Sequence, residues 1–170
     1  MQTSFFILGG ARSGKSRRAL ALAEELGASR VFVATAQAWD EEMSERIAQH
    51  KAERGAGWTT IEAPLELVEV LDELKGECDV CVVDCLTLWL SNLMHHNRDV
   101  DAETAQLCAA IAASPIPIIL VSNEVGLGIV PETPLGRTFR DAQGRLNQDV
   151  AAVCDHVEVL VAGLPLILKG

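Results

Sequence analysis

The 170-residue chain contains no apolar run that approaches the roughly 20 residues needed by a membrane-spanning helix. The segment before Gly9 carries no basic residue, and its apolar stretch, Phe5 to Leu8, is shorter than the core of a secretory signal peptide. These absences argue against an integral membrane protein and against a secreted one. We therefore expect a cytoplasmic protein that is not inserted in a membrane.

Basic residues are scarce relative to acidic ones. The chain has 14 Lys and Arg residues against 24 Asp and Glu residues, which gives a formal net charge of −10 and a pI near 4.8. Nucleic acids and anionic lipid surfaces attract basic proteins, so this balance excludes nucleic acid as an expected partner. Any phosphate group that the protein binds must be held by a local arrangement of donors, because the overall field repels anions.

Cysteine is also sparse, and its number is odd. Five cysteines cannot all pair with one another, which argues against a disulfide framework. Cys78, Cys81 and Cys85 are close in sequence, but no second Cys or His pair nearby completes a zinc site. We interpret them as small buried side chains of a strand.

The remaining composition is that of a folded globular protein. Hydrophobic residues make up 49% of the chain and charged residues 22%, which excludes disorder for most of its length. With this length and no linker, we expect a single domain over residues 1–170.

Hydrophobic periodicity predicts strands that alternate with helices. The predicted strands are 4–8, 30–34, 58–61, 79–83 and 116–121, and the predicted helices are 16–27, 40–54, 64–74 and 135–153. Residues 157–161 and 166–168 flank a turn and predict a C-terminal antiparallel hairpin. This alternation indicates an α/β fold with a mainly parallel central sheet and helices on both faces.

A phosphate-binding loop follows the first predicted strand. The segment GGARSGKS at 9–16 matches G-x-x-x-x-G-K-[ST] in full. In such a loop the backbone N–H groups and the next helix's N-terminus cradle phosphate, the lysine reaches the β- and γ-phosphates, and the hydroxyl binds Mg²⁺. The fold is therefore expected to be P-loop NTPase-like, with Lys15 catalytic. The expected nucleotide-binding residues of the loop are Gly9, Gly10, Ala11, Arg12, Ser13, Gly14, Lys15 and Ser16.

A second metal anchor is expected at Asp84. This carboxylate ends the apolar run Val80 to Val83, which is the arrangement that holds Mg²⁺ opposite a phosphate loop. We predict that Ser16 and Asp84 are the metal-binding residues. The alternative is that Asp84 only caps the helix that follows. These features indicate a nucleoside triphosphate with Mg²⁺, but not which molecule accepts the phosphoryl group.

One histidine lies among basic residues. On the predicted helix 40–54, His50 borders the apolar stripe and has Arg46 and Arg54 one turn away on either side. Nearby positive charge disfavours imidazolium, and a neutral imidazole is a competent nucleophile toward phosphorus. The spacing alone favours the alternative, in which His50 is a histidine packed at the edge of the core.

Three segments together resemble a known family. They are residues 9–16, 34–51 and 122–133, the last continuing into 136–148. The chain resembles, from about residue 5 to its C-terminus, the bifunctional adenosylcobinamide kinase/adenosylcobinamide-phosphate guanylyltransferases of cobalamin biosynthesis. The segment at 122–133 is the most specific of the three.

The resemblance implies two reactions and a trimer. ATP or GTP would first phosphorylate the aminopropanol hydroxyl of adenosylcobinamide. GTP would then transfer GMP to a histidine, which falls on His50, and adenosylcobinamide phosphate would accept it to give adenosylcobinamide-GDP. The Gly-rich loop around 126–128 and the arginines after it are expected to cover the corrinoid tail or the phosphate.

The family's guanine-nucleotide contacts extend beyond the phosphate loop. They would fall at strand ends and on the segment after His50. A carboxylate at Glu62 would accept hydrogen bonds from guanine N1 and N2. The implied positions are Ala34, Thr35, Ala36, Lys51, Ala52, Glu53, Arg54, Glu62 and Asp84.

Two other functions remain open from the sequence. In the first, the protein is a monofunctional small-molecule kinase in which His50 is structural. In the second, it is a GTP-dependent switch module, although the chain lacks the Asn-Lys-x-Asp guanine motif.

Overall fold

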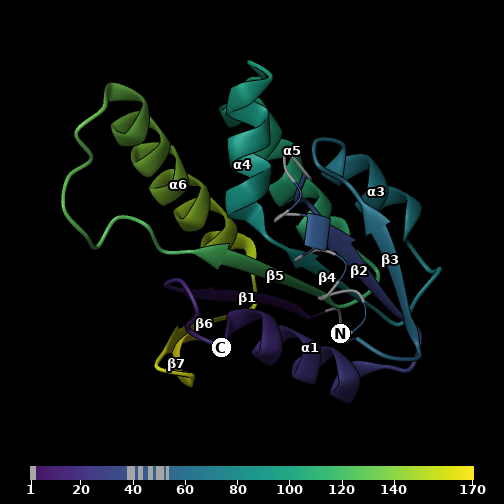
Figure 1. The fold of residues 1–170 in the computed structure, drawn as a ribbon. Coiled ribbons are helices and arrows are strands. Elements are labelled where there is room, and N and C mark those ends of the chain that lie inside the picture. Colours follow the sequence, from purple (N-terminus) through teal and green to yellow (C-terminus); the bar gives the residue numbers. More distant parts are fainter. Residues whose placement is uncertain (1–2, 38–40, 42–43, 46–47, 49–51, 53) are drawn as a thin grey trace.

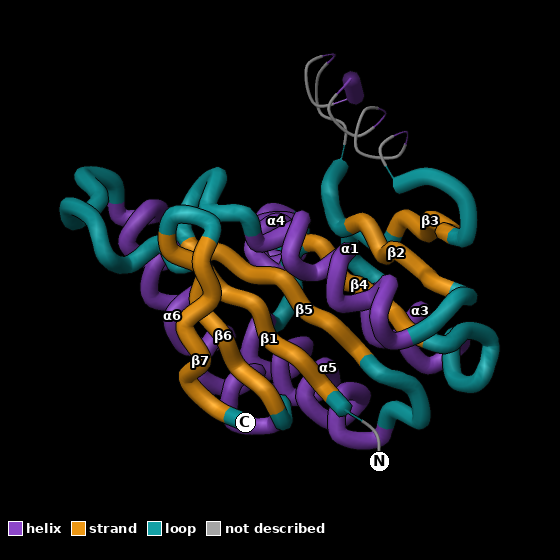
Figure 2. Tube along the Cα trace, turned by 90° about the horizontal axis from the view of Figure 1, so that it is seen from below, coloured by secondary structure: helices purple, strands orange, loops and turns teal. Residues whose placement is uncertain are grey.

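A seven-stranded sheet forms the centre of the molecule (Figures 1 and 2). The computed structural model describes residues 3–37, 41, 44–45, 48, 52 and 54–170. Its strand order is β3-β2-β4-β5-β1-β6-β7, and all neighbours are parallel except β6 and β7. The strands are β1 (Ser4–Gly9), β2 (Arg30–Ala34), β3 (Trp58–Glu62), β4 (Val80–Asp84), β5 (Ile118–Asn123), β6 (His156–Val161) and β7 (Leu164–Lys169).

Helices cover both faces of the sheet. On one face α1 packs over Ile7, Val82 and Val121, and on the other face the remaining helices pack over Phe6 and Leu120 (Figure 1). The helices are α1 (Lys15–Leu26), α3 (Leu67–Glu73), α4 (Leu86–His95), α5 (Val100–Ala113) and α6 (Pro134–Val153). The described residues between 41 and 52 are also helical. The predicted α/β class, mainly parallel sheet and C-terminal antiparallel hairpin are confirmed.

The central strands are buried on both sides, as parallel strands between helices must be. β4 is buried from Val80 to Val83 and β5 from Ile118 to Ser122. Each strand becomes partly exposed only at its last residue, which is Asp84 in β4 and Asn123 in β5. The first polar side chains that reach solvent are therefore at the carboxyl edge of the sheet, where open α/β sheets bind ligands.

Three helices differ from the sequence prediction. Helix α3 begins at Leu67 rather than Pro64, because the carbonyls of Pro64 and Leu65 accept hydrogen bonds from side chains of α4, Asn92 at 2.9 Å and Trp89 at 3.0 Å. Helices α4 and α5 were not among the predicted helices. None of the helices in the described part of the chain is long and apolar enough to cross a lipid bilayer.

A carboxylate ties the start of β1 to the start of β6. The Asp155 Oδ2 atom accepts hydrogen bonds from the backbone N–H and the hydroxyl of Ser4, both at 2.9 Å. These bonds, the backbone one first, hold the pKa of Asp155 below its usual value near 3.8. These hydrogen bonds therefore stabilise the folded state in full when the pH is above the usual pKa of the carboxyl group. The stabilisation is lost as the pH falls through the lower pKa that Asp155 has in the folded state.

We expect Asp155→Ala to lower the free energy of unfolding at pH 7 by about 1 kcal/mol, a modest value because the carboxylate is exposed. Urea unfolding of both proteins at several pH values measures the difference. The difference in free energy of unfolding should shrink in strong acid, where the wild-type carboxylate is protonated. A difference that stays constant with pH would show that the charge of Asp155 contributes nothing.

Candidate active site

The phosphate loop connects β1 to α1 and requires glycine at two positions. A side chain on Gly9 would bring its Cβ to 2.5 Å from the Ser13 hydroxyl and 2.8 Å from the Leu160 carbonyl. Gly14, at the N-cap of α1, has a φ of 98°, which favours glycine. The loop therefore closes tightly on itself and turns directly into a helix, so that backbone N–H groups and the helix N-terminus face one site.

Lys15 is buried against this loop. Its ammonium donates a hydrogen bond of 2.6 Å to the carbonyl of Gly10, and the residue is only 8% exposed. Burial lowers the pKa of Lys15, while the nearby charge of Asp84 opposes the shift. An anion bound in the loop would add negative charge beside this desolvated ammonium.

Asp84 meets the loop from another strand. The Ser16 hydroxyl donates to Asp84 Oδ2 at 2.6 Å, although the two residues are 68 positions apart. The N-cap of α4 is Cys85, with no side-chain capping bond, so Asp84 faces Ser16 rather than capping the helix. Mg²⁺ beside nucleotide phosphates is bound by oxygen ligands, and a hydroxyl and a carboxylate oxygen this close together are suitable ligands for it.

Thr35 fixes the end of β4. Its hydroxyl donates to the Cys85 carbonyl at 2.6 Å and accepts from the Cys85 N–H at 2.9 Å, and the residue is fully buried. The Thr35 carbonyl accepts a bond from Asn92 at 2.8 Å. The predicted nucleotide contact at Thr35 is thus a side chain already engaged within the protein, where it positions the backbone next to Asp84.

The other predicted strand-end residues lie nearby. Ala34 is paired in register with Asp84 on one side and with Glu62 on the other. Glu62 is exposed at the end of β3. The structure therefore brings the loop, residues 34–36, Glu62 and Asp84 to one edge of the sheet.

Arg54 is packed into the protein. Its guanidinium lies 3.8 Å from the centre of the Phe32 ring and donates to the Thr60 hydroxyl at 3.1 Å. Burial lowers its pKa, and the charge of Asp84 opposes that shift. Ala52 is helical and exposed, whereas His50, Lys51 and Glu53 lie outside the described residues.

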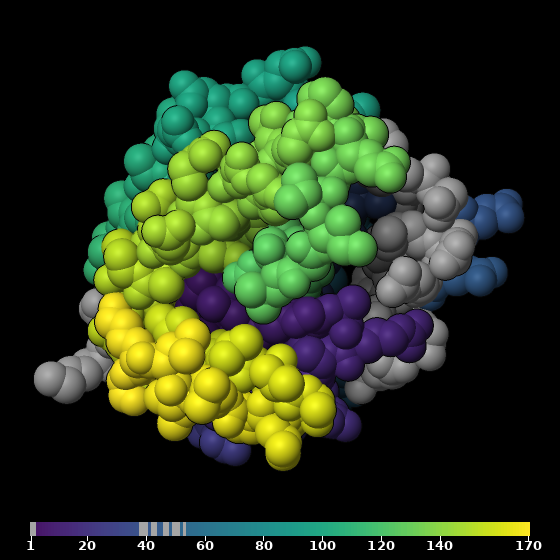
Figure 3. Space-filling view, turned by 90° about the vertical axis from the view of Figure 1, so that its left-hand side faces the viewer, coloured from purple at the N-terminus to yellow at the C-terminus, as the bar shows by residue number. Residues whose placement is uncertain are grey.

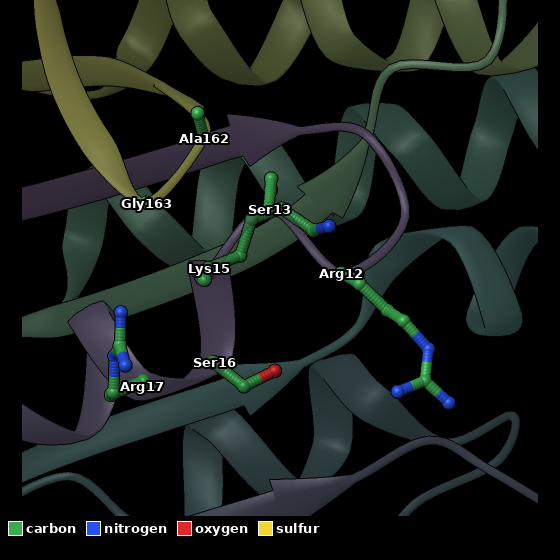
Figure 4. Close-up of a pocket in the computed structure, with 8 residues that line it drawn as sticks. Arg12, Ser13, Lys15, Ser16, Arg17, Ala162 and Gly163 are labelled. Atoms are coloured by element: carbon green, nitrogen blue, oxygen red, sulfur yellow. The ribbon is translucent and has the colours of Figure 1, made fainter.

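One part of the site was not predicted. The β6–β7 turn contacts the loop, since the Gly163 N–H donates to the Ser13 carbonyl at 3.0 Å. Together the turn and the loop line a pocket of about 450 Å³, and Figure 4 shows Ala162 and Gly163 beside Ser13, while the Arg12 side chain extends away. The sequence predicted the hairpin but carried no signal for this contact, which joins residues far apart in the chain.

Comparison with known proteins identifies relatives along nearly the whole chain. Residues 5–168 match the model of the cobinamide kinase / cobinamide phosphate guanyltransferase family, CobU. The bifunctional adenosylcobalamin biosynthesis protein CobP of Pseudomonas aeruginosa is 50% identical, and 96% of each chain is covered. The protein called CobU in Salmonella typhimurium is 38% identical and the one in Escherichia coli 36%, each over 96% of this chain and 98% of theirs.

A solved structure shares the fold. A KaiC-like protein of Pyrococcus horikoshii superimposes with a TM-score of 0.54 at 16% identity, over 92% of this chain and 70% of the other. That likeness agrees with the predicted P-loop NTPase-like fold and says nothing further about function. The match over residues 5–168 and the curated relatives show that the chain belongs to the cobinamide kinase / cobinamide phosphate guanyltransferase family and is a kinase and nucleotidyltransferase.

Proposed function

We propose that this enzyme phosphorylates adenosylcobinamide with ATP or GTP and then transfers GMP from GTP, through a guanylyl group on His50, to give adenosylcobinamide-GDP. The observation that carries the proposal is the Ser16–Asp84 pair, 2.6 Å apart at the mouth of a complete phosphate loop. Family membership supplies the two reaction types.

The kinase step uses the loop. Lys15 neutralises charge on the β- and γ-phosphates, and the loop N–H groups orient them. Ser16 and Asp84 fit Mg²⁺, which would be bound by these two oxygens and the phosphates. When bound, such an ion neutralises phosphate charge. Positioning and charge neutralisation account for most catalysis of phosphoryl transfer, so no further covalent chemistry is required of the protein.

The guanylyl step requires His50 to reach the α-phosphate. Support comes from the two ends of the segment that contains it. Thr35 is fixed immediately after β2, and Arg54 stacks on Phe32, which belongs to β2. The segment between them thus starts and ends at the sheet edge where the loop opens. We propose that Lys51–Arg54 and Ala34–Ala36 contact the nucleotide and that Glu62 accepts hydrogen bonds from guanine.

The corrinoid acceptor is proposed to lie beside the loop at residues 124–133. The Glu124 N–H donates to the Gly9 carbonyl at 3.1 Å, so this segment starts at the cradle. Leu127 is 89% exposed and Ile129 98%, which leaves apolar surface next to the phosphate site. Figure 3 shows this green segment beside the purple N-terminal segment on one face.

Substitution of both Leu127 and Ile129 by serine tests this placement. We expect the KM for adenosylcobinamide to rise, and an unchanged KM would contradict the placement.

We also propose that the enzyme is a homotrimer in the cytoplasm. Every residue of β7 is exposed, including four large apolar ones, and β7 is an edge strand. An unpaired strand edge can pair with another chain, and a large exposed apolar patch marks an interaction surface. Buried free thiols such as Cys81 suit a reducing compartment. Sedimentation equilibrium at the monomer mass of 18.3 kDa would exclude the trimer.

Labelled GTP tests the two-step function. With adenosylcobinamide and GTP labelled at the γ-phosphate, we expect labelled adenosylcobinamide phosphate. With GTP labelled at the α-phosphate, we expect label on the denatured protein that is labile in acid and stable in base, as a phosphorus–nitrogen bond to histidine is. ATP labelled at the α-phosphate is the control and should give none.

The two alternative functions would give different labelling results. Phosphorylated acceptor without covalent label would leave a monofunctional kinase. GTP binding with neither transfer reaction would indicate a switch module instead.

A further inference from the structure

Asn123 ends the strand that separates the phosphate loop from Asp84. β5 is hydrogen bonded to β1 on one side and to β4 on the other. In register, Asn123 is level with Gly9, the first residue of the loop, and Asp84 is level with Val121. A side chain at Asn123 therefore stands at the carboxyl edge between the cradle and the carboxylate.

Strand alternation shows which face the Asn123 side chain occupies. Ile119 and Val121 pack in the cluster on the α1 face, and side chains two residues apart share a face. Asn123 is the next residue in that series. By the same alternation Asp84 follows Val80 and Val82 onto the α1 face, which its contact with Ser16 at the start of α1 bears out. The carboxamide of Asn123 thus lies on the same side as the phosphate loop.

A buried polar network holds the backbone at this point. The Asn123 N–H donates to the Thr87 hydroxyl at 2.8 Å, and its carbonyl accepts from Asn147 at 3.2 Å. Asn147 also accepts from Ser122 at 2.8 Å and from Gln143 at 2.9 Å. All four side chains are buried, and Gln143 and Ser122 are wholly so. Buried polar networks rigidify what they join, and this one joins α4, α6 and the end of β5.

The network leaves the Asn123 carboxamide itself unused. Within the described part of the chain it makes no hydrogen bond, and the residue is partly exposed. A carboxamide offers two donors and one acceptor oxygen. Its backbone is thus fixed on both sides while its side chain is available to a ligand at the mouth of the loop.

We propose that Asn123 contacts the reacting groups in the kinase step, donating to an oxygen of the γ-phosphate and accepting from the attacking hydroxyl of the acceptor. This inference rests on the kinase half of the proposed function. The hydroxyl oxygen of adenosylcobinamide forms a bond to the γ-phosphorus, and the bond from that phosphorus to the β–γ bridging oxygen breaks. Its electron pair leaves with the nucleoside diphosphate, and the hydroxyl proton passes to water. The amide orients the hydroxyl and does not take its proton, because it is not basic at neutral pH.

Asn123→Ala tests the proposal. We expect kcat for phosphorylation of adenosylcobinamide to fall about 100-fold, the usual loss for one donor to a developing charge. The Kd for the nucleotide should remain near that of the wild type, because loop and lysine are intact. Asn123→Asp has the same shape but repels phosphate, so it should lose at least as much.

Controls separate this role from a structural one. Gln148→Ala removes an exposed carboxamide from the middle of α6 and should leave kcat unchanged. Thermal unfolding of each variant checks the fold, and if Asn123→Ala does not fold, the isosteric Asn123→Asp carries the test. Wild-type kcat in either folded variant, measured at saturating nucleotide, would overturn the proposal. A loss of activity in Asn123→Ala that merely follows weaker nucleotide binding would also overturn it.

A second assay keeps the two proposals distinct. If the wild type does not phosphorylate adenosylcobinamide, the proposed acceptor is wrong. Hydrolysis of the γ-phosphate by water, measured without acceptor, then still compares wild type with Asn123→Ala. Equal hydrolysis rates would reject the role of Asn123.

Discussion

Lys15→Ala is expected to lower kcat for phosphoryl transfer by about 10³-fold, at the upper end of the effect of removing one positioned donor. Lys15 is the cation of the loop, and it is already desolvated over the Gly10 carbonyl. A charge removed from water interacts more strongly with a phosphate than a surface charge does. Substitution removes this interaction from the transition state, where negative charge on the transferring group must be stabilised. Steady-state kinetics with saturating adenosylcobinamide measure the loss.

A surface lysine provides the matched control. Lys75 is paired with Asp72 on the exterior, 2.7 Å away, and Lys75→Ala should leave kcat and KM unchanged. The fold of Lys15→Ala is expected to survive, because a buried ammonium is replaced by an apolar group. Near-normal turnover in folded Lys15→Ala would mean that the loop does not bind the transferred phosphate.

His50→Ala is expected to abolish covalent labelling by GTP carrying an α-phosphate label, while phosphorylation of adenosylcobinamide continues. Two in-line displacements through a histidine need that nitrogen as nucleophile, and alanine offers none. The kinase step draws on Lys15, Ser16 and Asp84 and does not require the imidazole. The measurement is the label retained after denaturation, compared with labelled adenosylcobinamide phosphate formed by the same preparation.

The control for this variant is another histidine. His96 is exposed at the end of α4, and His96→Ala should label as the wild type does. Persistent labelling of His50→Ala would assign the nucleophile to another residue. Loss of both activities in a folded His50→Ala protein would indicate that the two steps share this side chain.

Much of the site was predictable because its signals are local. The loop at 9–16 combines glycines and a lysine at fixed offsets, and its conformation depends on residues within a few positions. Asp84 was predictable as the polar end of an apolar run. Helix α6 was predicted to within one residue, since its apolar positions recur with a helical period, and the structure adds that Thr133 caps its start. Helix α5 was missed, although Leu107 and Ile111 are both buried at helical spacing.

The functional roles of other residues depend on contacts across the fold. Thr35 was predicted as a nucleotide contact, and the structure places its hydroxyl on the backbone of Cys85. Gly163 was predicted only as part of a turn, and the structure places its N–H on the loop. No local pattern encodes either bond, because each joins segments that meet only when the sheet assembles.

By itself the sequence determined the chemistry that is available: an anion cradle, a carboxylate after a buried strand, an acidic surface and membership of a kinase and nucleotidyltransferase family. Tertiary structure alone decided that β5 lies between β1 and β4, and hence that Asn123 stands between the cradle and Asp84. The physical reason is the distance along the chain over which each kind of interaction acts. Turns, caps and periodicity arise from hydrogen bonds between near neighbours, whereas strand order is set by packing among helices and strands far apart in the chain.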